Sequence, residues 1–351
     1  MNAPQSAALV REQLNREMAP FNLSPLWEVL HALVPREPVT PCLPAHWKYG
    51  EVRPFLMRAA QAITADEAVR RVLILKNPGL DGQAAITQSL FAGLQLIMPG
   101  EVAPSHRHTQ SALRFIVEGT GAHTAVDGER TSMKPGDFII TPSWTFHDHG
   151  SQADGPVIWL DGLDIPMIRF FDAGFAENDA NRSQAVTRAE GSSMARYGHH
   201  MAPVRHDAPF GKTSPIFSYP YDRTLEALER LERDAPVDPW DGVKLRYVNP
   251  LTGGAPMPTM ATFMQKLPAG FAGKASRQTD GAVYSVVEGE GIVEIERGGQ
   301  SWRFEIAPRD HFVVPSWHTA RFSSIRGCVL FSFSDRPVHQ ALGIHKEERL
   351  S

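Results

Sequence analysis

The chain has 351 residues, a formal net charge of −4 and 21% charged residues, with no long basic run. Nucleic-acid-binding surfaces need clustered Lys and Arg, so this composition argues against a nucleic-acid partner. The two cysteines, Cys42 and Cys328, exclude a disulfide framework and fit a reducing compartment. No apolar run is long enough for a signal peptide or a membrane span, so we expect a cytoplasmic protein without a membrane partner.

Residues 1–79 are predicted to form a helical N-terminal arm. Ser24-Pro25, followed by apolar residues at helical spacing, predicts a helix that Pro35 ends. From Val39 the segment is rich in proline, which predicts irregular structure. We expect this arm to pack on the rest of the chain or on a neighbouring subunit.

Two elements are expected between the arm and the first histidines. Thr64 and Glu67 match a capping box, which predicts a short helix that continues to Val72. Alternation of apolar and polar residues from Thr87 to Met98 then predicts a long strand. The first compact domain is therefore expected to span about residues 80–170.

Histidines gather at two places within residues 80–170. His106 and His108 are spaced by two, so on a strand they point to the same side. Asp127-Gly128 is a strong hairpin signal, and further turn signals separate the short strands around it. Antiparallel strands of this kind can bring His147 back beside the first pair. The pattern predicts a β-barrel in which His106, His108 and His147 hold a metal.

Residues 171–240 are predicted to form a linker and a helix. Periodicity is lost and Gly, Ser, Asn and Pro become frequent, as in surface connections. His199 and His200 would face opposite ways in a strand, so we expect surface or structural roles for them. Apolar residues at helical spacing predict a helix from Asp222 that Pro236 ends.

Residues 241–351 repeat the pattern of the first barrel. Val117-Glu118-Gly119-Thr120-Gly121 recurs as Val287-Glu288-Gly289-Glu290-Gly291, an offset of 170 residues (287 − 117). Pro142-Ser143-Trp144 recurs as Pro315-Ser316-Trp317. Repetition of this kind predicts two copies of one barrel.

The repeat also locates the counterparts of the metal ligands in the second barrel. They are Ser276, Gln278 and Ala320, none of which is an imidazole. We therefore expect the second barrel to lack a metal and to serve packing, assembly or an accessory pocket. His311 and His318 do not lie at the positions that correspond to metal ligands, so we expect structural roles for them.

The spacing of the glycines and histidines in the first barrel resembles the two sequence motifs of the cupin superfamily. The matching residues are Gly100, His106, His108 and Gly119 in one motif, and Gly136, Pro142 and His147 in the other. The resemblance implies a mainly β bicupin. Its two antiparallel double-stranded β-helix (jelly-roll) barrels would be accompanied by a helical N-terminal arm and linker helices.

Two positions depart from the usual cupin pattern. Ala112 stands where most cupins have a glutamate ligand, and Trp144 stands where a glycine is usual. Besides the absent glutamate, three segments carry a closer resemblance, namely residues 106–115, 159–164 and 247–250. They resemble the gentisate 1,2-dioxygenase family, which also contains salicylate and 1-hydroxy-2-naphthoate 1,2-dioxygenases. That resemblance implies Fe(II), a homotetramer, and the opening of gentisate (2,5-dihydroxybenzoate) by dioxygen to give maleylpyruvate in aromatic catabolism. Imidazole ligands alone also admit zinc, copper or nickel.

Arg114 is the leading candidate for binding the substrate carboxylate. If the strand is unbroken, His106, His108 and Arg114 share one face, which places an arginine inside the barrel. Three neutral imidazoles leave the full charge on a divalent ion, so an anionic, bidentate substrate is favoured. A planar guanidinium matches a carboxylate. The alternative is that Arg114 pairs with a structural Asp or Glu.

The resemblance implies four further substrate-binding candidates. Gly93 and Gln95 would border the substrate ring, and Arg70 or Arg71 would reach the pocket mouth. The two arginines could equally be ordinary helix charges. Because glycine at position 93 leaves space, a broad substrate range is possible.

Two more residues are candidates for catalysis. His149 shares a face with His147 and could be a fourth ligand, a base beside the substrate hydroxyl or a buried polar residue; the resemblance favours the base. Asp161 could hold one of the imidazoles in its tautomer, or could be an ordinary aspartate at a strand end.

Three alternative functions stay open. The same site could act on salicylate, 5-aminosalicylate or 1-hydroxy-2-naphthoate. A more distant alternative is a zinc cupin isomerase, which needs no dioxygen. The last is a bicupin that binds a ligand without turnover.

Overall fold

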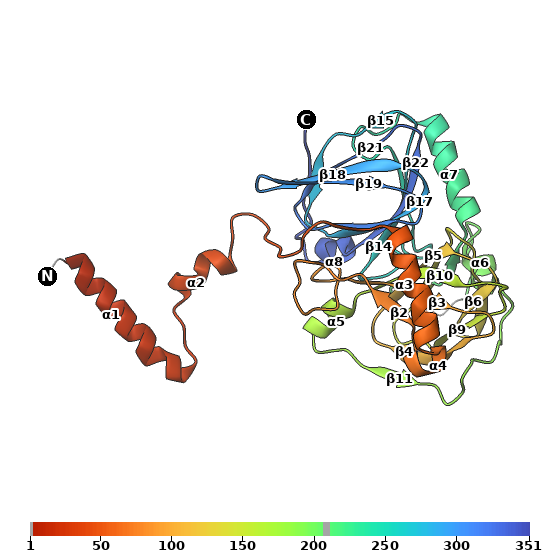
Figure 1. Cartoon of the computed structure of the whole chain (residues 1–351), viewed down its shortest axis with the longest axis horizontal. Helices are drawn as coiled ribbons and strands as arrows, with labels where there is room; N and C mark the ends of the chain where they lie inside the picture. Colours follow the sequence, from red (N-terminus) through yellow and green to blue (C-terminus); the bar gives the residue numbers. More distant parts are fainter. Residues whose placement is uncertain (1–2, 206–210) are drawn as a thin grey trace. The chain divides into compact units, whose positions relative to one another are not determined.

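The computed structural model describes residues 3–205 and 211–351, and the chain divides into two compact units, Met1–Val39 and Thr40–Ser351. The first unit holds α1 (Ala3–Met18), the 3₁₀ turn η1 (Ala19–Phe21) and α2 (Leu26–Leu33) (Figure 1). Helix α2 starts after Pro25 and ends before Pro35, as expected. None of the residues of α2 is buried within this unit, and Trp27 is 59% exposed.

The second unit contains two barrels, each made of two antiparallel sheets, so the predicted two-barrel, mainly β architecture is confirmed (Figure 1). The six-stranded sheet of barrel 1 has the order β12 (Ser218–Tyr219), β8 (Phe138–Thr141), β5 (Ala112–Glu118), β10 (Val157–Leu163), β3 (Phe91–Ile97), β2 (Val72–Ile74). Its second sheet has the order β11 (Ala176–Asn178), β4 (Val102–His108), β9 (His147–Ser151), β6 (Ala122–Val126), β7 (Glu129–Ser132).

Barrel 2 repeats this arrangement. One sheet has the order β1 (Ala45–Trp47), β20 (His311–Val314), β17 (Ala282–Gly289), β22 (Cys328–Ser334), β14 (Ala261–Leu267), β13 (Val243–Arg246). The other has the order β19 (Gln300–Ile306), β18 (Gly291–Arg297), β21 (Thr319–Ser324), β16 (Ser276–Gln278), β23 (Glu347–Arg349), with β15 (Phe271–Ala272) on β21. The helices of this unit are α3 (Tyr49–Ala62), α4 (Ala65–Ala68), α5 (Ile165–Phe170), α6 (Ser192–Tyr197), α7 (Tyr221–Asp234) and α8 (Arg336–Ala341).

The six-stranded sheets of the two barrels share one hydrophobic core. Phe115 on β5 stacks on Phe331 on β22 with ring centroids 4.1 Å apart. On β10, Ile158 and Leu160 belong to this shared core, whereas the intervening Trp159 packs inside barrel 1. Because side chains alternate along a strand, every second residue of β3, β5 and β10 points into the interior of barrel 1.

Two buried aspartates join the barrels reciprocally. Asp164 follows the last strand of barrel 1 and accepts a hydrogen bond from Thr259 Oγ1 of barrel 2 (2.6 Å). Asp335 follows the last strand of barrel 2 and accepts one from Ser89 Oγ of barrel 1 (2.5 Å). Each carboxylate also accepts a backbone N–H from its own barrel. The repeat therefore extends to the contacts that hold the two barrels together.

The segment after Val39 differs from the expected irregular arm. It belongs to the compact unit that holds the barrels, whereas the sequence placed the end of the arm at residue 79. β1 pairs with β20 of barrel 2, and α3 contains Pro54 within the helix. Pro54 costs a helix hydrogen bond, but Tyr49 and Leu56 of α3 are buried in the shared core. Tertiary burial outweighs local propensity here.

The capping box is present, although its helix is shorter than expected. Thr64 Oγ1 accepts a hydrogen bond from Glu67 N, and Glu67 Oε2 accepts one from Thr64 N. Helix α4 ends at Ala68 because Val69 adopts a positive φ of 56°. Val72, the predicted helix end, instead begins β2 and pairs with Gln95 on β3.

The region expected to be a surface linker is partly built into barrel 1. β11 pairs with β4, with Ala176 opposite His108 and Asn178 opposite His106. β12 pairs with β8 at the edge of the other sheet. The histidine-bearing strand is therefore covered on its outer edge. The predicted helix that ends before Pro236 is confirmed as α7.

Candidate metal centre and active site

The three predicted ligands meet inside barrel 1. His106 on β4 lies directly opposite His147 on β9, and their ring centroids are 4.5 Å apart. The ring of His108 lies 4.9 Å from that of His147 and 5.4 Å from that of His106. One nitrogen of each ring lies within 4.8 Å of the others. The i, i+2 spacing and the neighbouring strand together produce this triad.

Backbone carbonyls orient each imidazole. Nδ1 of His147 lies 3.0 Å from Thr145 O, and Nδ1 of His108 lies 2.9 Å from Gln110 O. Nδ1 of His106 lies 3.3 Å from Pro104 O. A ring that donates Nδ1–H to a carbonyl presents the Nε2 lone pair, which is the form that binds a metal.

All three imidazoles are neutral at ordinary pH. Burial, followed by the charge of Arg70, lowers the pKa of His106 to about 3. Burial is also the main cause that lowers the pKa of His108 to about 4, and it holds the pKa of His147 well below its usual value. Neutral imidazoles are the ligand form, and within the described residues no carboxylate joins the group. The donor set therefore fits a divalent transition metal.

Arg114 reaches the site by a route different from the expected one. The strand is not continuous from His106 to Arg114, because β4 and β5 lie in different sheets. Arg114 is on the inward face of β5, is 3% exposed and donates a hydrogen bond from Nη1 to Thr141 Oγ1 (2.5 Å). Its Nε lies 3.7 Å from Asp161 Oδ1. The guanidinium of Arg114 therefore lies inside the barrel, and it also has an acidic partner, which were the two alternatives that the sequence left open.

Asp161 does not hold an imidazole in the described structure, which corrects that expectation. Its Oδ1 accepts a hydrogen bond from Trp159 Nε1 (3.0 Å) and faces Arg114. Trp159 and Asp161 are two residues apart on β10, so they share the interior face. Burial raises the pKa of Asp161 to about 6, and Arg114 opposes this rise.

His149 lies beside the triad without belonging to it. Its ring centroid is 5.9 Å from that of His147, and the ligand group contains only the three other histidines among the described residues. Nδ1 lies 2.9 Å from Thr124 Oγ1, and the buried Nε2 has no hydrogen-bond partner. Burial and the charge of Arg114 hold its pKa well below the usual value. The neutral ring of His149 is therefore held through Nδ1 alone, and its Nε2 is left without a protein partner.

The two adjacent arginines have different positions. Arg70 Nη2 lies 2.7 Å from His106 Nδ1 and 3.0 Å from Pro104 O. A protonated Nδ1 cannot accept from Arg70, so this close approach is repulsive when His106 has its ligand tautomer. Arg71, by contrast, is paired with Glu101 (2.5 Å) away from the histidines. The structure thus favours Arg70 over Arg71 as the cation at the site.

Gly93 and Gln95 lie on β3 beside Asp161 and Trp159, respectively, on β10. A Cβ at Gly93 would lie 2.5 Å from Val72 Cγ1 and 3.3 Å from the ring of Phe91. The space expected beside Gly93 is therefore filled by Val72, which corrects the idea that this glycine opens the pocket. Gln95 is buried.

Sequence reasoning missed Thr124 and Thr141, which bind His149 and Arg114. Neither threonine has a distinctive spacing from the histidines. Each reaches its partner from the neighbouring strand, β6 beside β9 and β8 beside β5. Strand order is needed to find such contacts.

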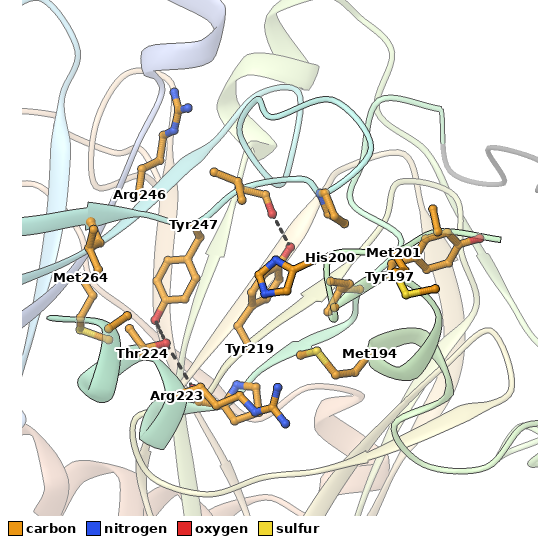
Figure 2. Close-up of a pocket in the computed structure, with 18 residues that line it drawn as sticks. Met194, Tyr197, His200, Met201, Tyr219, Arg223, Thr224, Arg246, Tyr247 and Met264 are labelled. Atoms are coloured by element: carbon orange, nitrogen blue, oxygen red, sulfur yellow. Dashed lines mark hydrogen bonds between the residues drawn. The ribbon is translucent and has the colours of Figure 1, made fainter. Parts of the chain in front are cut away.

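A cavity of about 570 Å³ lies elsewhere, between α6, α7 and β13 (Figure 2). Tyr247 donates to Thr224 Oγ1, and Tyr219 donates to Val248 O. The metal-ligating triad does not line this cavity. We therefore place the chemistry at the histidines.

The cupin domain model matches residues 93–163, which include the triad. Gentisate 1,2-dioxygenase 1 of Aquipseudomonas alcaligenes is 50% identical over 339 residues, covering 97% of this chain and 96% of that protein. This chain belongs to the gentisate 1,2-dioxygenase family. A second member, from a Streptomyces species, is 37% identical over 98% of this chain and 97% of its own length. The family makes this protein an aromatic ring-cleaving dioxygenase.

A solved structure of the same kind supports the fold assignment. Salicylate 1,2-dioxygenase from Pseudoaminobacter salicylatoxidans, in adducts with gentisate, has a TM-score of 0.89 and 33% identity, covering 99% of this chain and 95% of that chain. The predicted bicupin class and family resemblance are therefore confirmed. Among the described residues, no helix is long and apolar enough to cross a membrane.

Barrel 2 has the equivalent positions without the ligands. Ser276 on β16 lies opposite Ala320 on β21, as His106 lies opposite His147 in barrel 1. Gln278, the counterpart of His108, accepts a hydrogen bond from Arg336. A guanidinium thus lies where barrel 1 gathers imidazoles.

Proposed function

We propose that this protein is an Fe(II)-dependent gentisate 1,2-dioxygenase. It opens the gentisate ring between the carboxyl-bearing carbon and the adjacent hydroxylated carbon, with dioxygen as co-substrate, to give maleylpyruvate. The observation that carries the proposal is a triad of neutral histidines next to a buried guanidinium, in a chain 50% identical to a gentisate 1,2-dioxygenase.

His106, His108 and His147 would hold the iron through Nε2. When bound, the iron supplies Lewis acidity and the redox chemistry that couples dioxygen to the ring. The protein contributes two cations to the site, Arg70 and Arg114, and the carboxylate that lies beside Arg114 is Asp161. This excess of positive charge favours a substrate that carries a carboxylate and an ionisable hydroxyl.

Each remaining site residue has a role in this proposal. Arg114 binds the substrate carboxylate, while Asp161 holds Arg114 in place. Arg70 turns from His106 toward the substrate, because an anion relieves its repulsion by the imidazole. His149 accepts the proton of the substrate 2-hydroxyl at Nε2, the nitrogen that has no protein partner.

The walls of the substrate pocket would come from β3. Gln95 borders the substrate ring, and Gly93 allows Val72 and Phe91 to approach closely. Arg71 is not assigned a substrate contact, because Glu101 already binds its guanidinium.

Salicylate, 5-aminosalicylate and 1-hydroxy-2-naphthoate are the alternative substrates, since each pairs a carboxylate with an adjacent hydroxyl. The gentisate adducts of a salicylate 1,2-dioxygenase support an overlap between these substrates. Oxygen uptake measured on gentisate, salicylate and 1-hydroxy-2-naphthoate separates them. We expect the highest kcat/KM on gentisate.

The test couples metal analysis to oxygen uptake. Protein prepared with iron should bind about one iron per chain and consume oxygen with gentisate. His106→Ala should lose both properties, whereas the exposed control His199→Ala should keep them. An iron-free His106→Ala variant that still consumes oxygen with gentisate would refute the assignment.

Two rivals give different results in the same assay. A zinc isomerase would turn over its substrate without oxygen and would not need iron. A ligand-binding bicupin would bind gentisate without oxygen uptake. The family membership and the buried guanidinium both favour turnover by a dioxygenase.

We also propose a homotetramer in the cytoplasm. The unit Met1–Val39 leaves the apolar residues of α2 exposed, which supports their burial against another copy. Cys42 and Cys328 are both free thiols, which fits a reducing compartment. Light scattering coupled to size-exclusion chromatography tests the assembly, and a monomer would contradict it.

A further inference from the structure

The mouth of barrel 2 contains a cavity of about 220 Å³ that the proposed reaction does not use. Ser276, Gln278 and Ala320, the counterparts of the metal ligands, line it. It therefore occupies the place that corresponds to the metal centre of barrel 1. Its remaining walls include both cationic and aromatic side chains.

Several hydrogen-bond donors line this cavity, among them one on β13, one on β17 and one on α8. Lys244 on β13, Tyr284 on β17 and Arg336 at the start of α8 all line it. Tyr284 interacts electrostatically with both Lys244 and Arg336, so the three groups are close together. Tyr284 lies opposite Ser332 on β22, as Arg114 lies opposite Asp161 on β10. Tyr284 is thus the counterpart of the proposed carboxylate-binding arginine.

These donors have unused hydrogen-bonding capacity. The Tyr284 hydroxyl has no hydrogen-bond partner among the described residues, although phenols normally find one when buried. Lys244 Nζ, with three donor hydrogens, contacts Asp241 Oδ1 (2.9 Å). Arg336 uses Nε for Asp280 Oδ2 (3.2 Å) and Nη2 for Gln278. A ligand could therefore bind without breaking these contacts.

The carboxylates around the cavity limit the charge of its ligand. Asp241, Asp280 and Glu347 balance much of the positive charge of Lys244 and Arg336. Burial lowers the pKa of Lys244, but Asp241 and Tyr284 more than compensate, so the ammonium stays charged. Arg277 and Arg349, which also line the cavity, are paired with Glu348 and with Asp238, Asp241 and Glu347. Because these cations already have carboxylate partners, a monoanion gains the free donors at a smaller electrostatic cost than a dianion.

The apolar walls favour a flat ligand. Phe263, Phe322 and Val314 line the cavity, and the ring of Phe263 lies 5.4 Å from both Lys244 Nζ and the guanidinium carbon of Arg336. Phe263 is also the counterpart of Gly93, so an aromatic wall replaces a glycine. Aromatic walls around a cluster of donors suit a ring that carries one carboxylate.

We propose that barrel 2 is a metal-independent binding site for a small aromatic carboxylate, held by Lys244, Tyr284 and Arg336. The site is separate from the triad and does not depend on which substrate barrel 1 cleaves.

The test uses the full chain after iron removal, with 4-fluorobenzoate as the probe and ¹⁹F NMR as the readout. Titration of wild type should show binding, and the neutral analogue 4-fluorobenzamide should not compete. Arg114→Met removes one of the two guanidiniums at the barrel 1 site and should weaken binding there. The remaining binding is assigned to barrel 2 by its loss on barrel 2 substitutions. In that background, Tyr284→Phe and Lys244→Gln should each weaken the remaining binding by about tenfold. Lys76→Gln, an exposed lysine, is the matched control and should have no effect.

Three results would overturn the proposal. They are absence of binding in the Arg114→Met background, equal binding after both barrel 2 substitutions, or equal competition by the neutral analogue. Circular dichroism checks the fold of each variant. If Lys244→Gln does not fold, Tyr284→Phe alone decides, because it removes one hydroxyl and keeps the ring in the core.

Discussion

The pairing of Arg114 with Asp161 makes a quantitative prediction. Their Nε and Oδ1 atoms are 3.7 Å apart, and both residues are at most 5% exposed. Coulomb's law gives an attraction of about 4 kcal/mol at an effective dielectric constant of about 20, and about 1 kcal/mol in bulk water. We therefore expect a coupling energy of about 2 to 4 kcal/mol between the two side chains.

Replacing Arg114 or Asp161 alone does not measure the coupling energy between them. Burial raises the pKa of Asp161 to about 6, so the desolvation of its charge outweighs the attraction of Arg114. Asp161→Asn both relieves that desolvation and leaves a buried guanidinium without a carboxylate, and the two effects oppose one another. A double-mutant cycle with Asp161→Asn and Arg114→Met cancels the desolvation of each residue and isolates the pair.

The assay is equilibrium urea unfolding of the four metal-free proteins at pH 7.5, with refolding checked at each point. Asp154→Asn, at an exposed position, replaces Asp161→Asn in a control cycle and should be additive with Arg114→Met to within about 0.5 kcal/mol. A coupling below about 0.5 kcal/mol between Arg114 and Asp161 would refute the buried ion pair.

Three other predictions follow from the same geometry. Gly93→Ala should destabilise the protein by about 1 to 3 kcal/mol, because its Cβ would lie 2.5 Å from Val72 Cγ1, and adding Val72→Ala should restore much of the loss in urea unfolding. Burial raises the pKa of Asp164 from 3.8 to about 6 in the folded state, so the folded protein binds this proton more tightly than the unfolded chain does. The contribution of Asp164 to the free energy of unfolding should therefore fall by about 3 kcal/mol as the pH rises from about 4 to 6. Asp164→Asn should remove that part of the pH dependence, and an unchanged slope would contradict it. Chelation of the metal should lower the thermal unfolding midpoint of wild type but not of His106→Ala, because the metal binds only the folded protein with an intact triad. With free metal at about a thousand times Kd, chelation should remove about 4 kcal/mol of stabilisation.

Local spacing predicted the parts of the site that lie on single strands. His106 and His108 share a face because side chains alternate, and the hairpin at Asp127-Gly128 has the two positive φ values, 48° and 76°, that its sequence favours. The helix before Pro236 and the capping box at Thr64 are equally local. Such features depend on backbone sterics within a few residues.

The internal repeat determined more of the chain than local spacing did. The offset of 170 residues located Ser276 as the counterpart of His106, and the recurrence of Pro142-Ser143-Trp144 at Pro315 (315 − 142 = 173) located Ala320 as the counterpart of His147. Ser276 and Ala320 lie opposite each other, as His106 and His147 do in barrel 1. The absence of imidazoles at those positions could be read directly from the sequence. What occupies the space instead, including Arg336, depends on how α8 packs on the barrel.

Contacts between strands were decided by tertiary structure. Arg114 was expected at the site on a continuous strand, yet it arrives from a different sheet, and Asp161 contacts Arg114 and Trp159 instead of an imidazole. The side of Gly93 that was expected to be open is filled by Val72 from β2.

The sequence by itself determined the ligand triad, the two-barrel repeat and the loss of ligands in barrel 2, because these follow from periodicity along the chain. Only the tertiary structure decided the partners of Arg114, Asp161 and Arg70 and the position of the segment after Val39. The physical reason is that strand order and barrel closure set which interior side chains meet, and neither is encoded in the spacing of residues on one strand.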